Sequence, residues 1–149
     1  MKTATEMTLV TLLNKQVANW TVLYTKLHNY HWNVKGPQFF TLHGKFEELY
    51  NEASEHIDAL AERVLSIGGT PVATLAACMQ TASISEAPAG ETAEQMVGSI
   101  VRDFSLLVDE LKTAREAAQQ ADDEATADML LSIQSGLEKH IWMLNAFLQ

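Results

Sequence analysis

The sequence has few of the residues that interrupt helices or crosslink small folds. Its 149 residues include three prolines, seven glycines and a single cysteine, Cys78. One cysteine excludes a disulfide within the chain and fits a reducing compartment. No apolar run approaches the roughly 20 residues of a membrane span, and no small-residue cleavage site follows the N-terminal stretch. We therefore expect a cytoplasmic, mainly helical protein with no membrane partner.

Basic residues are also scarce. Ten lysines and arginines face 19 acidic residues, which gives a formal net charge of −9. A chain that neutralises nucleic-acid phosphates needs the opposite balance. The composition therefore favours cations over DNA as partners.

Apolar residues repeat with a helical period along most of the chain. One stripe predicts a long helix over residues 5–34, which Gly36-Pro37 ends. A second stripe covers 42–64 and stops at Gly68-Gly69-Thr70-Pro71, with glycine for a left-handed cap and proline just beyond it. The short connection predicts that these two helices pack as an antiparallel hairpin.

The second half of the chain predicts another hairpin. Residues 68–90 form a link too long to lack structure, so we expect a short helix at 75–79. Thr92 and Gln95 have the spacing of a capping box that opens a third helix. A fourth helix begins at about Asp123.

This order of elements predicts an all-α fold, a ferritin-like four-helix bundle with a long crossover that contains a short helix. The length fits one domain over residues 1–149. Ferritin-like di-iron proteins bind metal inside the bundle through Glu-x-x-His pairs, and this chain has none. The residues three positions before its five histidines are Thr25, His28, Phe40, Ala53 and Leu137.

Four potential metal ligands share one face of the second helix, away from its apolar stripe. At 100° per residue from Leu42, His43, Glu47, Asp58 and Glu62 fall at roughly 100°, 140°, 160° and 200°. The i,i+4 spacing within each close pair places both side chains over one spot. Imidazole with carboxylate suits iron, zinc or manganese.

One helix cannot bring both pairs to a single metal ion, because His43 and Asp58 lie about 22 Å apart along its axis. Two copies packed antiparallel about a two-fold axis could do so. In one common register, His43 faces Glu62 of the other copy and Glu47 faces Asp58. Two-fold dimers are the commonest oligomers.

Two further features fit such a shared site. Asn51 and Ser54, near the centre of this face, have short side chains that would let two helices approach. His31 ends the first helix, where the turn leads back towards His43. The hypothesis is an intersubunit metal site with His31, His43 and Glu47 from one chain and Asp58 and Glu62 from the other.

The plain alternative is a solvated polar face, as on most bundle helices. His28 has a stronger alternative, because it could simply pack against neighbouring aromatic residues. For His56 and His140, no carboxylate at ligand spacing on a shared face stands out as a partner.

The motifs HNYHWNVKGPQFFTLH and EASEHIDALAERVLSIGG, with the ending KHIWMLNAFL, resemble the Dps mini-ferritins, the DNA-binding proteins from starved cells. The resemblance covers essentially the whole chain. It implies a hollow dodecamer that oxidises Fe(II) at di-iron ferroxidase centres on dimer interfaces, preferentially with hydrogen peroxide, and stores a ferric mineral inside.

The resemblance also implies roles for individual residues. His31 and His43 would be iron ligands from one subunit, with Asp58 and Glu62 from the partner. Relatives commonly have aspartate where Glu47 stands, so this residue would be a direct or a water-mediated ligand. Trp32 has two interpretations, an electron donor when one iron is bound or a packing residue at the interface.

A second acidic group begins the fourth helix. Favourable carboxylates at a helix N-terminus are a sufficient account of Asp122 and Asp123. In the family this region lines negatively charged three-fold pores for Fe(II), which makes a pore role plausible for Glu124 and Asp128 as well. An acidic funnel raises the local concentration of cations.

Three functions stay open at this point. The leading one is a peroxide-using ferroxidase and iron store. The second is a nucleoid DNA-binding stress protein with a secondary metal site, although the first twenty residues contain only Lys2 and Lys15 and weak or absent DNA binding is expected. The third is a structural oligomer with a vestigial site.

Overall fold

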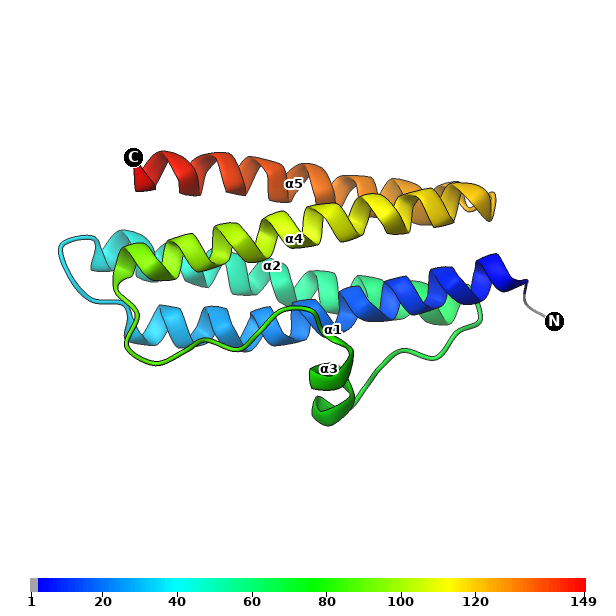
Figure 1. Cartoon of the computed structure of the whole chain (residues 1–149), viewed down its shortest axis with the longest axis horizontal. Helices are drawn as coiled ribbons and strands as arrows, with labels where there is room; N and C mark the ends of the chain where they lie inside the picture. The colour runs from blue at the N-terminus through cyan, green and yellow to red at the C-terminus, as the bar shows by residue number, and fades with distance from the viewer. Residues whose placement is uncertain (1–2) are drawn as a thin grey trace.

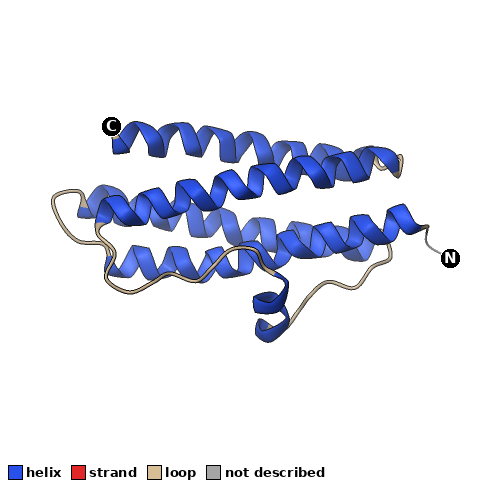
Figure 2. Ribbon diagram, viewed as in Figure 1, coloured by secondary structure: helices blue, strands red, loops and turns tan. Residues whose placement is uncertain are grey.

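The computed structural model describes residues 3–149, apart from the side chain of Met7. Lys2, counted above in the N-terminal stretch, lies outside the described residues. The described part of the chain contains helices and loops only (Figure 2). The five helices are α1 Ala4–Asn33, α2 Phe39–Ser66, α3 Leu75–Thr81, α4 Ala93–Gln120 and α5 Glu124–Leu148.

The four long helices form two antiparallel hairpins that lie side by side (Figure 1). α1 pairs with α2, and α4 pairs with α5. Between the hairpins, a crossover carrying α3 returns the chain along the bundle to the end where α2 begins (Figure 1). The predicted order of hairpin, long crossover and hairpin is therefore confirmed.

Capping residues and glycines explain where the helices begin and end. The predicted capping box of Thr92 and Gln95 is present at the start of α4, and a second one, which the sequence analysis did not single out, joins Thr3 and Glu6 at the start of α1. Gly36 and Gly68 have φ angles of 108° and 83°. These left-handed conformations favour glycine, as expected after a helix.

The core lies between the apolar stripes of the long helices. Its largest fully buried side chains include Trp20, Tyr30, Phe46 and Phe104. The buried residues of α2 are Leu42, Phe46, Leu49, Ala53, Leu60 and Val64, all in the predicted stripe. With this stripe turned inward, the polar face of α2 that carries Asp58 and Glu62 is exposed.

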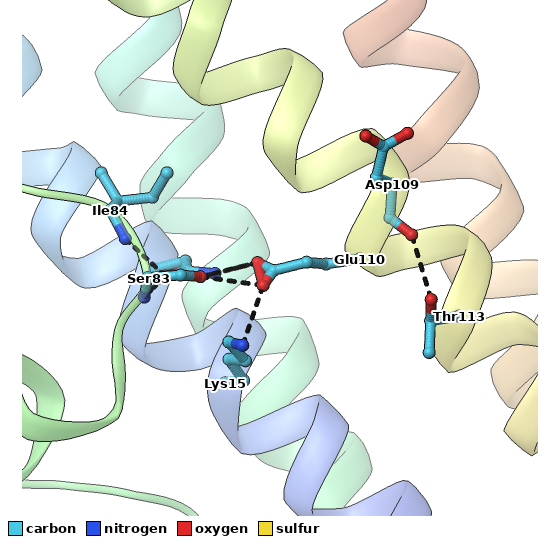
Figure 3. Close-up of polar contacts among 7 residues, drawn as sticks. Lys15, Ser83, Ile84, Asp109, Glu110 and Thr113 are labelled. Carbon is cyan, nitrogen blue, oxygen red and sulfur yellow. Dashed lines mark hydrogen bonds and ion pairs between the residues drawn. The ribbon is translucent and has the colours of Figure 1, made fainter.

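A buried asparagine of α1 fastens the crossover to the bundle. Asn19 is fully buried in α1, and its side-chain oxygen accepts hydrogen bonds from the backbone N–H groups of Ser83, at 2.8 Å, and Ile84, at 3.3 Å. Its amide donates to Glu110 of α4 at 2.8 Å. Glu110 also pairs with Lys15 at 3.2 Å (Figure 3). One side chain thus joins α1, the crossover and α4.

Helix boundaries differ slightly from the predicted ones. α1 covers 4–33 instead of 5–34, and α3 extends two residues beyond 79. α2 begins three residues before Leu42, because the backbone N–H of Leu42 bonds to the carbonyl of Gln38 at 2.9 Å and closes the first helical turn. Within residues 3–149, no helix combines the length and apolar character needed to cross a membrane.

Candidate metal centre

His31 and His43 meet at the end of the bundle where α1 turns into α2. His31 lies in the last turn of α1 and His43 near the start of α2. Their imidazole rings stack with centroids 3.7 Å apart and an interplanar angle of 13°. Phe39 stacks on the outer side of His43 at 5.0 Å. His31 is buried, with 8% of its surface exposed.

Each of these two imidazoles is held by the backbone of the other residue. Nδ1 of His31 lies 2.7 Å from the carbonyl oxygen of His43, and Nδ1 of His43 lies 2.7 Å from the carbonyl oxygen of His31. A carbonyl can only accept a hydrogen bond, so both Nδ1 atoms carry the proton. The lone pair of each neutral ring is then on Nε2, ready to bind a metal ion.

The two acidic residues at the other end of α2 have no such support within the chain. Asp58 and Glu62 are both exposed. Within residues 3–149, neither carboxylate has a hydrogen bond or ion pair with another side chain. Among these residues, no group of three potential metal ligands includes His31 or His43. A single chain therefore does not bring the predicted ligands together.

Glu47 lies one helical turn after His43 and is exposed. Its carboxylate accepts a hydrogen bond from the Tyr50 hydroxyl at 3.3 Å. Loss of solvent around the hydroxyl and the nearby carboxylate of Glu47 raise the pKa of Tyr50. The carboxylate thus has one protein donor and remains accessible from solvent.

Aromatic residues surround the histidine pair on the α1 side. The ring of His28 stacks on Tyr50 with centroids 3.7 Å apart, and its Nδ1 bonds to the Tyr24 carbonyl at 2.8 Å. This is the packing role predicted for His28. Trp32 is 69% exposed and lies 5.3 Å from the His28 ring.

The acidic group before and within α5 divides into two kinds of residue. Asp123 caps α5 by accepting from the Thr126 backbone at 3.0 Å, and it pairs with Arg63 of α2 at 2.9 Å. Burial alone would raise the pKa of Asp123, but the bonds from Thr126 and Arg63 hold it below its usual value. The remaining members, Asp122, Glu124 and Asp128, are exposed.

The other two histidines lie inside or beside the bundle. His56 packs on Trp20 with ring centroids 4.6 Å apart, and burial lowers its pKa. His140 of α5 contacts Glu52 of α2, with 2.8 Å between Nε2 and the carboxylate. Helical spacing could not predict this partner of His140, because Glu52 lies on another helix. Packing of α5 on α2 supplies the partner.

Comparison with known proteins places this geometry in a family. The family described as ferritin-like domain matches residues 10–149. The chain is 68% identical, over 149 residues and 100% of both chains, to the DNA protection during starvation protein of Brevibacillus brevis. It matches the crystal structure of a Dps protein from Bacillus brevis with a TM-score of 0.99 and 68% identity, covering 100% of both chains.

A more distant structure shows the same fold. Dps from Vibrio cholerae O1 matches with a TM-score of 0.95 and 34% identity, over 100% of this chain and 94% of that one, and is described as a member of a broad superfamily of ferritin-like diiron-carboxylate proteins. The fold is therefore ferritin-like, as predicted. Within that class the chain belongs to the Dps family, the DNA protection during starvation proteins.

Proposed function

We propose that this protein is a ferroxidase and iron store that protects DNA by consuming Fe(II) and hydrogen peroxide together. The observation that carries the proposal is the His31–His43 pair, whose protonated Nδ1 atoms leave both Nε2 atoms for metal. The membership in the Dps family supports it, as does the description of the Vibrio cholerae relative as a diiron-carboxylate superfamily member.

The proposed centre is shared between two chains packed antiparallel along α2. One chain contributes the Nε2 atoms of His31 and His43, with Glu47 as a direct or water-mediated ligand. The partner contributes the exposed carboxylates of Asp58 and Glu62. Asn51 and Ser54, both exposed on the same face, allow the two helices to approach.

The chemistry follows from binding two iron ions in one centre. Two Fe(II) ions each give one electron to one hydrogen peroxide, which with two protons becomes two water molecules. No one-electron reduction of peroxide occurs, so no hydroxyl radical is released. The hard carboxylate oxygens stabilise the ferric product, while few imidazoles keep the ions transferable.

The proposal includes a hollow dodecamer, a single domain over residues 1–149 and a cytoplasmic location. Asp122, Glu124 and Asp128 are exposed and can line an acidic entry for Fe(II). Asp123 belongs to this region but is already engaged with Arg63 and Thr126. Trp32 is exposed enough for either of its two roles, electron donation or packing against another subunit.

Stopped-flow absorbance of ferric iron tests the proposal on the purified oligomer. Fe(II) is added without oxygen, followed by hydrogen peroxide or by oxygen. Oxidation much faster with peroxide, at two irons per peroxide, is expected. A rate no higher than in buffer would contradict the proposal.

Asp58→Ala should remove rapid oxidation and leave the oligomer assembled, because the carboxylate lies outside the core and has no partner among the described residues of its own chain. We expect a fall of at least 100-fold in rate, since a charged ligand is lost. Size-exclusion chromatography checks assembly. Asp109→Ala, the same change at an exposed position of α4, is the matched control, and equal rates in both variants would sink the assignment of Asp58.

A nucleoid-binding function is the second candidate, favoured by the name of the relatives alone. The net charge of −9 argues against it. Retention of plasmid DNA in a gel-shift assay at physiological salt would raise this candidate above the first.

A further inference from the structure

A second group of metal-ligating side chains lies between α2 and α5, away from the His31–His43 pair. Glu48, Glu52 and His140 each place a ligand atom within 4.8 Å of the others. On α2 the two glutamates lie roughly 110° around the helix from the face of His43 and Asp58. They line a hollow of about 340 Å³ that His140 and Lys45 also border.

His140 is the fixed part of this group. It is 8% exposed, and its Nε2 lies 2.8 Å from the Glu52 carboxylate. On the other side of the ring, Nδ1 lies 3.3 Å from the ammonium nitrogen of Lys45. The same ammonium lies 3.4 Å from both carboxylate oxygens of Glu48.

These contacts define which ring nitrogen carries the proton. A lysine ammonium has donors and no acceptor, so Nδ1 must be the acceptor. Nε2 then carries the proton and donates it to Glu52. Glu52 accepts this hydrogen bond over 2.8 Å and so fixes the orientation of the ring. A carboxylate holding one N–H of an imidazole while the other nitrogen offers its lone pair is the usual support of a metal-binding histidine.

We propose that this hollow is a mononuclear site for a first-row divalent cation and that it binds Zn(II) best. The ion would occupy the position where the Lys45 ammonium now lies. Nδ1 of His140 and the carboxylate of Glu48 are the ligands, and Glu52 orients the ring. Zinc needs bonds of about 2.0–2.2 Å to nitrogen and oxygen, so the donors close in by about 1 Å. The Glu48 side chain, 54% exposed, can make that movement.

The ammonium of Lys45 supports this position. It is a cation that already contacts the lone pair of His140 and both oxygens of Glu48, and its side chain is only 16% exposed. Lysine and metal ion therefore compete for one place. Replacement of Lys45 by a neutral residue should strengthen metal binding.

The site goes beyond the proposed iron chemistry and is independent of it. All its donors come from one chain, so it needs no partner subunit. It should bind one ion per chain whether or not the intersubunit centre works.

Isothermal titration calorimetry with Zn(II) tests the site in the assembled protein. The titrations use a background in which His31, His43, Asp58 and Glu62 are all replaced by alanine, which removes both halves of the intersubunit centre. We expect one zinc per chain. His140→Gln and Glu48→Gln should each weaken binding by at least 10-fold, and Glu52→Gln by about 10-fold because it supports a ligand. Lys45→Gln should tighten binding several-fold.

Glu55→Gln is the matched control, because Glu55 is an exposed acid on α2 outside the donor group. Its affinity for zinc should equal that of the background protein. Equal losses in Glu55→Gln and Glu48→Gln would overturn the proposal in favour of a diffuse acidic surface. Weaker or unchanged binding in Lys45→Gln would also overturn it, and that variant retains every donor even if His140→Gln disturbs packing.

Discussion

At the scale of single residues, the position of a proton decides what each histidine can do. The Nδ1 protons of His31 and His43 are committed to backbone carbonyls, whereas the proton of His140 is on Nε2 and faces Glu52. The fold thus presents Nε2 at one location and Nδ1 at the other. A change of tautomer at either place would require breaking a hydrogen bond of 2.7 or 2.8 Å.

Asp123→Asn tests a residue whose charge contributes to stability. The amide keeps the helix cap, since asparagine caps well, but it loses the ion pair with Arg63. We expect a loss of about 1–2 kcal/mol in the free energy of unfolding at pH 7. Because the folded-state pKa of Asp123 is lowered, its contribution is complete above the ordinary aspartate pKa and is lost as pH falls through the folded value.

Urea unfolding of the wild type and Asp123→Asn at several pH values measures this contribution. The gap between the two proteins should shrink below about pH 4. Asp122→Asn, at the exposed neighbour with a φ angle of 55°, should unfold like the wild type, since asparagine tolerates that conformation. A gap that persists unchanged into acid would assign the loss to packing instead of charge.

From the sequence, residues could be brought together across a short turn, as with His31 and His43, but not across the bundle. Helical spacing alone grouped His43 with Glu47, and the turn predicted that His31 would come near. The reciprocal carbonyl bonds depend on the angle of the turn, which no spacing encodes. Glu52 and His140 are 88 positions apart, and only packing of two hairpins brings them together.

At the scale of elements, the crossover depends on a few polar anchors. Asn19→Ala would leave the Ser83 and Ile84 N–H groups without their acceptor and would remove one of the donors to Glu110, which keeps Lys15. We expect a loss of about 2–4 kcal/mol in the free energy of unfolding, because these groups are buried or half-buried. Equilibrium urea denaturation measures it.

Thr113→Ala is the matched control for Asn19→Ala. The Thr113 hydroxyl donates only to the Asp109 carbonyl in its own helix, at 3.3 Å on the exposed side of α4 (Figure 3). Its loss should change stability by less than about 0.5 kcal/mol. Similar losses in both variants would show that Asn19 does not anchor the crossover.

The long helices could be predicted from sequence because periodicity, glycine breaks and one capping box agreed. The path of the crossover could not. The sequence predicted only a short helix within the crossover. The position of the crossover depends on Asn19 and on Lys26, whose ammonium donates to the Ser85 carbonyl at 3.0 Å. In the sequence, Asn19 and Lys26 are simply polar residues beside an apolar stripe, and nothing in the spacing shows what they contact.

At the scale of the whole molecule, charge and geometry act together. A net charge of −9 per chain is multiplied in any oligomer, and such a charge attracts cations and repels nucleic-acid phosphates. Peroxide consumption by the proposed centre would protect DNA from a distance. The rate of iron uptake should therefore fall as salt is raised, since added ions screen the acidic surface.

The histidines and the carboxylates of the proposed centre lie at opposite ends of α2. A pair of chains therefore makes two centres, each with the histidines of one chain and the carboxylates of the other. A chain with His31→Ala and His43→Ala and a chain with Asp58→Ala and Glu62→Ala should each be inactive alone. In a mixed pair, one centre keeps all its ligands and the other loses them all. Random co-assembly should then restore about one quarter of the wild-type peroxide-dependent iron oxidation.

Co-refolding the two variants in equal amounts, with each variant refolded alone as a control, measures this recovery. Activity that stays at the level of the separate variants would mean that each chain works by itself. Recovery would mean that two defective alleles complement each other in one cell. The placement of ligands along one helix would then decide a genetic property, namely which mutations are rescued by which others.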